Sequence, residues 1–339
     1  MRKIATQDAV GRPLGHDVTK IIPGSFKGVA FRKGHIISEQ DVEELLSIGK
    51  YSIYVMEMPE GYIHEDEAGV RLARAFAAED IDLVGPKEGK VTFVSRVNGL
   101  LKIRVDALTR INLTEDVMLS TLHTYTPVKP DEQVGATRII PLTIPETVIS
   151  EIETTCARED KIIRVMPYLH KHVGALVTGT EIVEGRIRDG FDESVGAKVG
   201  GYGQVVLEKR MARDDPEEIS SNIRRLKEHG MDIILITAGL SVDPDDATVM
   251  GVKQAGAQVV FYGTPILPGA MFLYARLGET AILGLPACVF FHKTTAFDVF
   301  FPRILAGENI KKEQVAALGH GGYCRNCEEC RYPVCGFGK

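Results

Sequence analysis

The second half of the chain alternates apolar runs with amphipathic runs of helical period. Residues 173–179 and 231–240 are almost entirely apolar, whereas residues 214–230 begin with aspartates and proline and end with glycine, as helices often do. Apolar strands that alternate with helices are typical of a parallel sheet with both faces covered. The pattern therefore predicts an α/β fold with three layers around a mostly parallel sheet.

The first half has a different pattern, with short strands, prolines and isolated helices, which indicates an α+β accessory region. In residues 90–105, two β-rich runs flank Asn98-Gly99, and this pair suits a hairpin turn. Ser38 is placed to cap the first predicted helix. The predicted helices cover residues 38–49, 65–79 and 146–160.

These patterns divide the chain into three predicted parts. We expect an accessory α+β region over 1–170, an α/β domain over 173–316 and a cysteine-rich tail over 320–339.

Composition and charge narrow the function classes. Hydrophobic residues make up 44% of the chain and charged residues 25%, which is the balance of a globular protein with an ample core. A net charge of −6 argues against a general nucleic-acid partner. The longest apolar run, 281–291, is too short to cross a bilayer, and the first residues contain no apolar signal-peptide core. We expect a cytoplasmic protein with neither nucleic-acid nor membrane partners.

Four of the six cysteines lie close together at the C-terminal end. Cys324, Cys327, Cys330 and Cys335 have the spacing C-x2-C-x2-C-x4-C. Four thiolates can complete a tetrahedral zinc site or hold an iron–sulfur cluster. The spacing leaves both metal centres open, and a redox disulfide or free thiols remain the alternative.

The loop 237–248 is a candidate ligand site because it follows a predicted buried strand. Gly239 allows close backbone approach, and Thr237 and Ser241 offer hydroxyls. The next helix begins near Asp246, so its free N–H groups would favour an anion, and neighbouring carboxylates such as Asp243 could bridge Mg²⁺ to a phosphate. The alternative is ordinary loop chemistry, with Asp-Pro turns and an aspartate cap.

Four segments together resemble a known family. V-T-G-T-E-I, I-T-A-G-L-S-V-D-P-D-D-A-T, V-V-F-Y-G-T-P-I-L-P-G-A-M and I-L-G-L-P-A-C-V are similar in order and spacing to the molybdopterin-binding (MoCF) domain. The Mog-type adenylyltransferases and the MoeA/gephyrin-E molybdenum insertases share this domain. The resemblance covers about 173–305, and the T-G-x-E opening is closer to the insertases.

The resemblance implies a set of site residues. Glu181 and Asp246 would hold a divalent cation in the catalytic role, and Asp243 would be a further metal ligand. Residues implied to contact molybdopterin or its adenylate are Thr178, Gly179, Gly239, Ser241, Thr248, Pro268, Gly269, Gly284, Leu285 and Pro286.

The chain departs from the family pattern at several positions. Thr180 stands where the family has the aspartate of TGDE, and Ala238 replaces the first glycine of the GG pair. The PGKP loop has become Pro268-Gly269-Ala270-Met271 without its lysine, and GLPGNP has become G-L-P-A-C-V at 284–289. These changes put full insertase catalysis in doubt, and the cysteine tail is not part of the general family pattern.

Two functional hypotheses follow from the resemblance. The first is an insertase-like protein of molybdenum cofactor biosynthesis that takes adenylated molybdopterin, molybdate and Mg²⁺, forms a homo-oligomer and serves a molybdenum enzyme. The second is a non-catalytic cofactor carrier or sensor with a tail that responds to metal or redox state.

Overall fold

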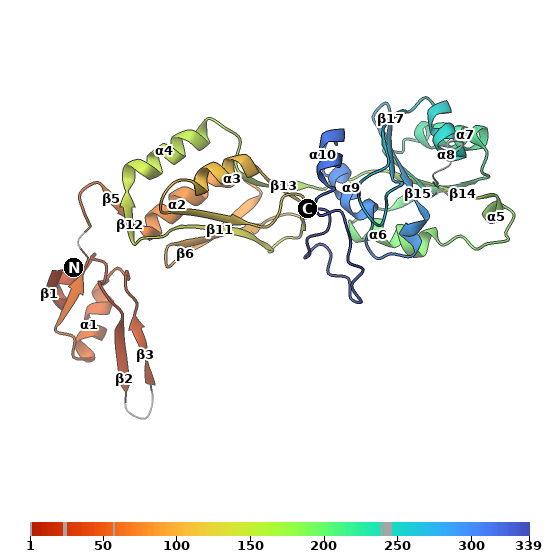
Figure 1. Cartoon of the computed structure of the whole chain (residues 1–339). Helices are drawn as coiled ribbons and strands as arrows, with labels where there is room; N and C mark the ends of the chain where they lie inside the picture. The colour runs from red at the N-terminus through yellow and green to blue at the C-terminus, as the bar shows by residue number, and fades with distance from the viewer. Residues whose placement is uncertain (1, 23–25, 57, 238–239, 241–245) are drawn as a thin grey trace. The chain divides into compact units, whose positions relative to one another are not determined.

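The computed structural model describes residues 2–22, 26–56, 58–237, 240 and 246–339. The chain forms two compact units (Figure 1). The first comprises Met1–Arg96, Ile103–Leu122 and Pro130–Arg164, and the second comprises Val97–Lys102, His123–Lys129 and Val165–Lys339. Two short segments of the first half, Val97–Lys102 and His123–Lys129, belong to the second unit. The predicted domain limits stay a prediction.

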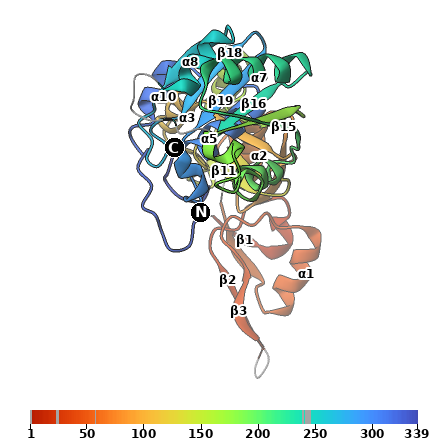
Figure 2. The same cartoon turned by 90° about the vertical axis from the view of Figure 1, so that its right-hand side faces the viewer.

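The start of the first unit is a small group of strands with one helix. Its elements are β1 (Arg2–Ala5), η1 (Thr6–Ala9), β2 (Val18–Ile22), β3 (Phe26–Phe31), α1 (Glu39–Ser47) and β4 (Ser52–Val55). Strands β1 and β4 pair antiparallel, as do β2 and β3, and α1 lies beside them (Figure 2). Ser38 and Asp41 form a capping box at the start of α1, so the predicted cap is confirmed.

The rest of the first unit is a four-stranded antiparallel sheet with helices. The strand order is β6-β7-β11-β9, and Leu72 and Phe76 of α2 are among the fully buried side chains. The elements are β5 (Tyr62–His64), α2 (Glu65–Phe76), β6 (Ile81–Lys87), β7 (Lys90–Ser95), α3 (Val105–Asn112), β9 (Val117–Thr121), β11 (Gln133–Ile139), β12 (Thr143–Pro145) and α4 (Glu146–Ala157).

The predicted hairpin over residues 90–105 is wrong. Strand β7 pairs with β6 and β11, whereas β8 (Gly99–Ile103) belongs to another sheet with β10 (Pro127–Val128) and β13 (Ile163–Pro167). A Cβ on Gly99 would lie 2.3 Å from the carbonyl oxygen of Met166, so this glycine allows close backbone approach. The hairpin turn joins β6 to β7 instead, through Glu88 and Gly89, both at positive φ.

The second unit contains a six-stranded sheet with the order β15-β14-β16-β19-β18-β17. Strands β15, β14, β16 and β19 are parallel, and β18 and β17 complete the sheet in antiparallel pairing. The strands are β14 (Val173–Thr178), β15 (Val206–Ala212), β16 (Ile233–Thr237), β17 (Gln258–Tyr262), β18 (Leu273–Leu277) and β19 (Thr280–Leu285).

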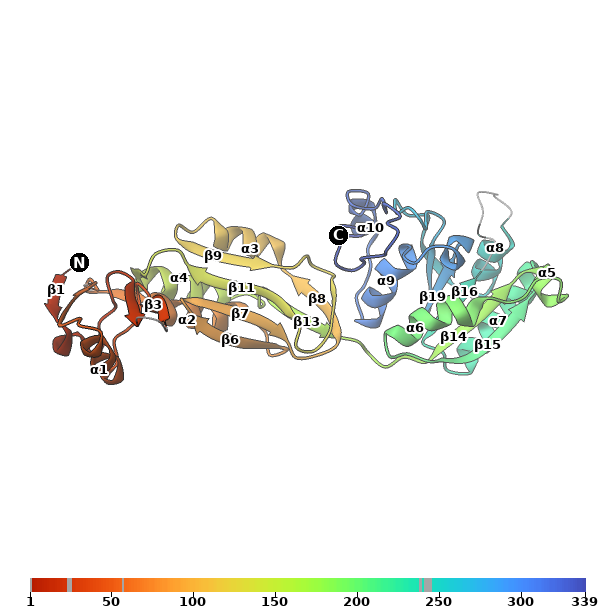
Figure 3. The same cartoon turned by 90° about the horizontal axis from the view of Figure 1, so that it is seen from below.

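Helices cover both faces of this sheet, so the predicted three-layer α/β fold is confirmed (Figure 3). One face packs against α7 (Pro216–Glu228) and α8 (Ala247–Gln254). The other packs against α9 (Ala296–Leu305) and its neighbours. The remaining helical segments are α5 (Thr180–Val183), η2 (Asp192–Gly196), α6 (Ala197–Gly201), η3 (Ala287–Phe290) and α10 (Lys312–Ala317). Across the described ranges, no helix has the length and apolar character needed to cross a membrane.

Candidate functional site

The carboxyl ends of the parallel strands meet at one edge of the sheet. Val177 of β14 is in register with Thr237 of β16, and Thr237 is in register with Leu285 of β19. The predicted site residues that follow these strands therefore share an edge, which is where open α/β sheets bind ligands.

Two threonines lie at this edge with different hydrogen bonding. Thr178 donates through Oγ1 to the carbonyl oxygen of Thr237 at 3.2 Å, so its hydroxyl is already engaged. The Thr237 side chain is 2% exposed, and its Oγ1 has no hydrogen-bond partner among the described residues. A buried hydroxyl without a partner costs free energy, so a ligand that supplied one would gain from it.

The turn after β14 is held by a side chain that the sequence analysis did not assign to the site. Asp214, in the loop after β15, accepts hydrogen bonds from Thr180 N at 3.0 Å and Thr180 Oγ1 at 3.3 Å. Gly179 begins the turn at a φ of +143°, which side-chain-bearing residues rarely adopt. Glu181 is exposed in the short helix α5 that follows. Because β15 ends at the same edge, the strand-end rule alone could have identified Asp214.

Asp246 is the N-cap of α8. Its Oδ1 accepts from the backbone N–H of Thr248 at 2.8 Å and of Val249 at 3.3 Å. The prediction that the N–H groups at this helix start are free is therefore wrong for these two, because the cap carboxylate occupies them. Asp246 is 8% exposed and Thr248 is 3% exposed. Burial, followed by the charge of Asp246, raises the pKa of Tyr262 at the end of β17.

Pro268 and Gly269 lie in the loop before β18 and pack against the start of α9. The carbonyl oxygen of Pro268 accepts from Ala296 N at 3.1 Å. A Cβ on Gly269 would stand 2.6 Å from Ala296 Cβ and 2.7 Å from Ala296 N. In this structure the glycine therefore makes room for the helix, and its predicted cofactor contact stays a prediction.

Residues 284–286 are buried at the end of β19. The space beside the Gly284 Cα is filled by Leu240 and Leu273, each with an atom 3.0 Å from where a Cβ would be. Leu285 is fully buried, and Pro286 leads into η3. Their predicted contacts to a cofactor stay predictions. The predicted site residues Gly239, Ser241 and Asp243 lie outside the described residues.

Within the described ranges, no three histidine, cysteine, aspartate or glutamate side chains are grouped closely enough to hold one metal ion. The Mg²⁺ role of Glu181 and Asp246 therefore stays a prediction. The four tail cysteines instead share the wall of one pocket of about 640 Å³.

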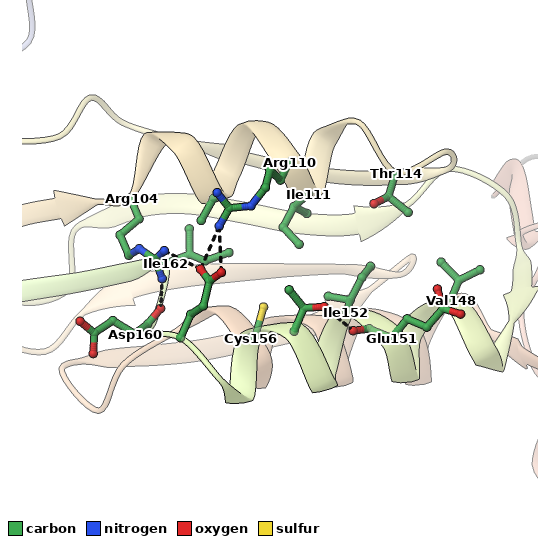
Figure 4. A pocket seen from close by; sticks show the side chains of 13 residues that line it. Arg104, Arg110, Ile111, Thr114, Val148, Glu151, Ile152, Cys156, Asp160 and Ile162 are labelled. Carbon is green, nitrogen blue, oxygen red and sulfur yellow. Dashed lines mark hydrogen bonds and ion pairs between the residues drawn. The ribbon is translucent and has the colours of Figure 1, made fainter.

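A smaller pocket of about 250 Å³ lies between α3 and α4 in the first unit (Figure 4). Its wall includes Ile152 and Cys156, and burial raises the pKa of that thiol. At one end Arg104 and Arg110 both pair with Glu159, at 2.5 Å and 2.8 Å. Because these charges already have partners, we assign no chemistry to this pocket.

The comparisons with known proteins concern parts of the chain. Residues 174–306 match a family model described as a probable molybdopterin binding domain, and residues 3–57 match a domain of unknown function. A CinA-like protein of Mycobacterium avium is 32% identical over 81 residues, which is 24% of this chain and 19% of that protein. The CinA-like protein of Mycobacterium leprae is 34% identical over the same length. The aligned segment thus spans about a fifth of the curated relatives.

Solved structures give weaker likenesses. CinA from Thermoplasma acidophilum has a TM-score of 0.31 and 19% identity, with 34% of this chain and 88% of that chain covered. A molybdopterin biosynthesis MoeA protein from Pyrococcus horikosii has a TM-score of 0.33 and 12% identity, with 90% and 74% covered. These scores are too low to support a statement about function. The firm similarity is that residues 174–306, with their mostly parallel α/β sheet, match a probable molybdopterin binding domain.

Proposed function

We propose that the carboxyl edge of the six-stranded sheet binds molybdopterin or its adenylate. The proposal is carried by one observation: within the segment that matches a probable molybdopterin binding domain, Thr237 places a buried hydroxyl, with no partner among the described residues, at the edge where the strands end. A polar ligand group at this edge would satisfy that hydroxyl.

The binding test uses two threonines on neighbouring strands. Thr237→Val removes the hydroxyl at the carboxyl edge and should weaken molybdopterin binding about tenfold, the equivalent of one hydrogen bond. Thr280→Val makes the same change at the amino end of β19, away from the proposed site. There Oγ1 donates to the Met231 carbonyl oxygen, and the change should leave the affinity for molybdopterin unchanged. Binding would be measured by titration without oxygen. A wild-type protein that does not bind either form of the cofactor would end the proposal.

The role proposed for Asp246 needs a separate test because this residue also caps a helix. Asp246→Asn keeps an oxygen that can accept from Thr248 N and removes the negative charge. We expect α8 to stay folded and the Mg²⁺ dependence of cofactor binding to be lost. Asp215→Asn is the matched control, since Asp215 caps α7 through the same kind of bond to Glu218 N at 2.8 Å. Unchanged Mg²⁺ dependence in Asp246→Asn would remove Asp246 from a metal role.

The insertase and carrier hypotheses differ in one product. An insertase would release AMP from adenylated molybdopterin when given molybdate and Mg²⁺, with Glu181 and Asp246 holding the cation. A carrier or sensor would bind the cofactor without releasing AMP. The altered loops at 268–271 and 284–289 support the carrier, and the retained Glu181, Asp246 and Thr248 support the insertase.

A further inference from the structure

The C-terminal tail, residues 321–339, is a closed loop built onto the α/β unit. Gly338 N donates to the carbonyl oxygen of Gly321 at 3.0 Å, which joins the two ends of the loop. Cys324 N donates to the Leu267 carbonyl oxygen at 2.8 Å, and Leu267 N donates to Gly322 at 2.8 Å. The tail is therefore attached to the segment that leads directly into Pro268 and Gly269.

Side chains of the tail also pack on α9. Phe337 is 5% exposed and belongs to the same core cluster as Phe300 and Phe301. Tyr332 donates through its hydroxyl to the Asp298 carbonyl oxygen at 2.9 Å, and burial raises its pKa. These contacts fix the path of the chain on both sides of the cysteines, as Figure 3 shows for the tail beside α9.

The pocket of about 640 Å³ lies between this loop and residues 291–294, and all four tail cysteines line it. A single zinc ion binds sulfur at about 2.3 Å, which would bring four thiolates to within about 4 Å of one another. The pocket that the four cysteines line, at about 640 Å³, is much larger than a single ion needs. In a 4Fe–4S cluster each thiolate binds a different iron, so the four thiolates stand farther apart around a larger volume.

We infer that Cys324, Cys327, Cys330 and Cys335 hold an iron–sulfur cluster in this pocket, rather than one zinc ion. Each thiol gives up its proton to solvent as its sulfur binds iron. The spacing of the cysteines left the two metal centres open, and the size of the pocket that they line favours the cluster.

The surroundings of the pocket fit a negatively charged centre. Lys293, Arg325 and Arg331 line it, and their charges would offset those of the thiolates and sulfides. The hydroxyl of Thr294, which is 6% exposed, lies 3.0 Å from Cys330 Sγ. A hydrogen bond from this hydroxyl to a ligating sulfur would stabilise the more negative, reduced cluster and raise its reduction potential.

The first test measures iron, zinc and acid-labile sulfide in the full chain, purified and reconstituted with Fe²⁺ and sulfide without oxygen. We expect iron and sulfide in equal amounts, with the visible absorption of a cluster. A variant with all four tail cysteines changed to serine should lose both, whereas Cys156→Ser and Cys288→Ser should keep both. One zinc per chain without iron would overturn the inference, and so would equal iron in the four-serine variant. Circular dichroism of that variant shows whether the fold survives.

A second test separates a cluster at this position from iron bound elsewhere. Thr294→Val should keep the cluster and lower its reduction potential, measured by titration with electron paramagnetic resonance. Thr264→Val is the matched control, because the hydroxyl of Thr264 donates to the Gly269 carbonyl oxygen at 3.4 Å and not to a sulfur. Equal potentials in wild type and Thr294→Val would place the cluster away from Cys330 and overturn the assignment. Neither test depends on molybdopterin binding.

Discussion

The two edges of the six-stranded sheet differ in the hydrogen bonding of their threonine side chains. At the amino edge, Asp232 accepts from His172 N at 2.8 Å and lies 3.5 Å from Lys171 Nζ. Thr280 donates to the Met231 carbonyl oxygen at 3.1 Å. At the carboxyl edge, Thr237 has a buried hydroxyl without a partner in the described part of the chain. Satisfied groups contribute to stability, whereas an unsatisfied buried group is a cost that a ligand can relieve.

Helix α9 connects the two edges, and at its amino-edge end the Arg303 Nη2 atom is buried without a hydrogen-bond partner among the described residues. The helix begins where Ala296 N donates to Pro268 at the carboxyl edge, and Leu305 near its end accepts from Leu169 N, just before β14. At this amino side, Arg303 is 1% exposed and pairs with Glu308 at 2.7 Å. Lys102 also donates to Glu308, and the Arg303 guanidinium lies over the Tyr125 ring.

The largest effect should come from breaking this buried ion pair. Glu308→Gln leaves the Arg303 cation buried without its counter-charge, so the free energy of unfolding of the second unit should fall by about 3–5 kcal/mol. Denaturant unfolding followed by a probe in that unit measures the change. Glu313→Gln on the exposed side of α10 is the control and should stay within about 0.5 kcal/mol of wild type. A loss below about 1 kcal/mol in Glu308→Gln would show that the amino edge does not depend on this pair.

The ion pair between Arg303 and Glu308 should also make the stability of the second unit depend on pH. Burial alone would raise the pKa of Glu308, but Arg303 and Lys102 outweigh it and hold the pKa below its ordinary value of 4.5. A lowered carboxyl pKa contributes stability above the unfolded value, and that contribution is lost as the pH falls through the folded pKa. The stability difference between wild type and Glu308→Gln should therefore be constant above about pH 5 and shrink below 4.5. If the stability difference between wild type and Glu308→Gln stayed constant below pH 4.5, the lowered pKa assigned to Glu308 would be contradicted.

At the carboxyl edge, the contact between Gly269 and α9 should give a smaller loss. Gly269→Ala combines a backbone at φ +120° with a Cβ 2.6 Å from Ala296, and should destabilise the unit by about 3 kcal/mol. Gly263→Ala is the control, since its φ is +89° but its Cβ would meet nothing closer than 3.8 Å. The control should lose about 1 kcal/mol. Equal losses in the two variants would mean that the helix start moves aside at little cost.

The smallest changes in the free energy of unfolding should come from replacing the two threonines. Thr280→Val removes a donor from the buried Met231 carbonyl and should cost about 1 kcal/mol of unfolding free energy. Thr237→Val removes a hydroxyl that bonds to no described residue, so unliganded stability should change by less than about 0.5 kcal/mol. Thermal or denaturant unfolding of the two variants measures both changes. A larger loss in Thr237→Val would show that its hydroxyl has a structural partner and is not reserved for a ligand.

Local signals in the sequence predicted local structure well. Ser38 caps α1 with Asp41 as expected, and Asp215 caps α7 at the start of the predicted helical segment 214–230. Both predictions rest on side chains that bond to a backbone within three residues, so no distant part of the chain is needed. The hairpin predicted from Asn98-Gly99 was wrong because the role of this glycine depends on a distant segment. Gly99 makes room for the backbone at Met166, which is far away in sequence.

For the candidate site too, features set by the local sequence could be predicted, and features that depend on distant contacts could not. The order of apolar strands and helices was enough to predict the α/β layers and the edge at which Thr178, Thr237 and residues 284–286 gather. It could not show that Asp246 occupies the N–H groups of α8, or that Gly269 packs on α9, since both depend on atoms brought together by folding.

The sequence by itself determined the alternation of apolar strands with helices, the helix caps and the spacing of the four tail cysteines. Each of these is a property of residues that are near one another along the chain. Only the tertiary structure decided which buried polar groups find a partner among the described residues, as Thr280 does and Thr237 does not. It also placed the cysteines around a pocket beside Thr294. The physical reason is that hydrogen bonds and packing act over a few ångströms in space, and the chain reaches those distances only when remote segments fold together.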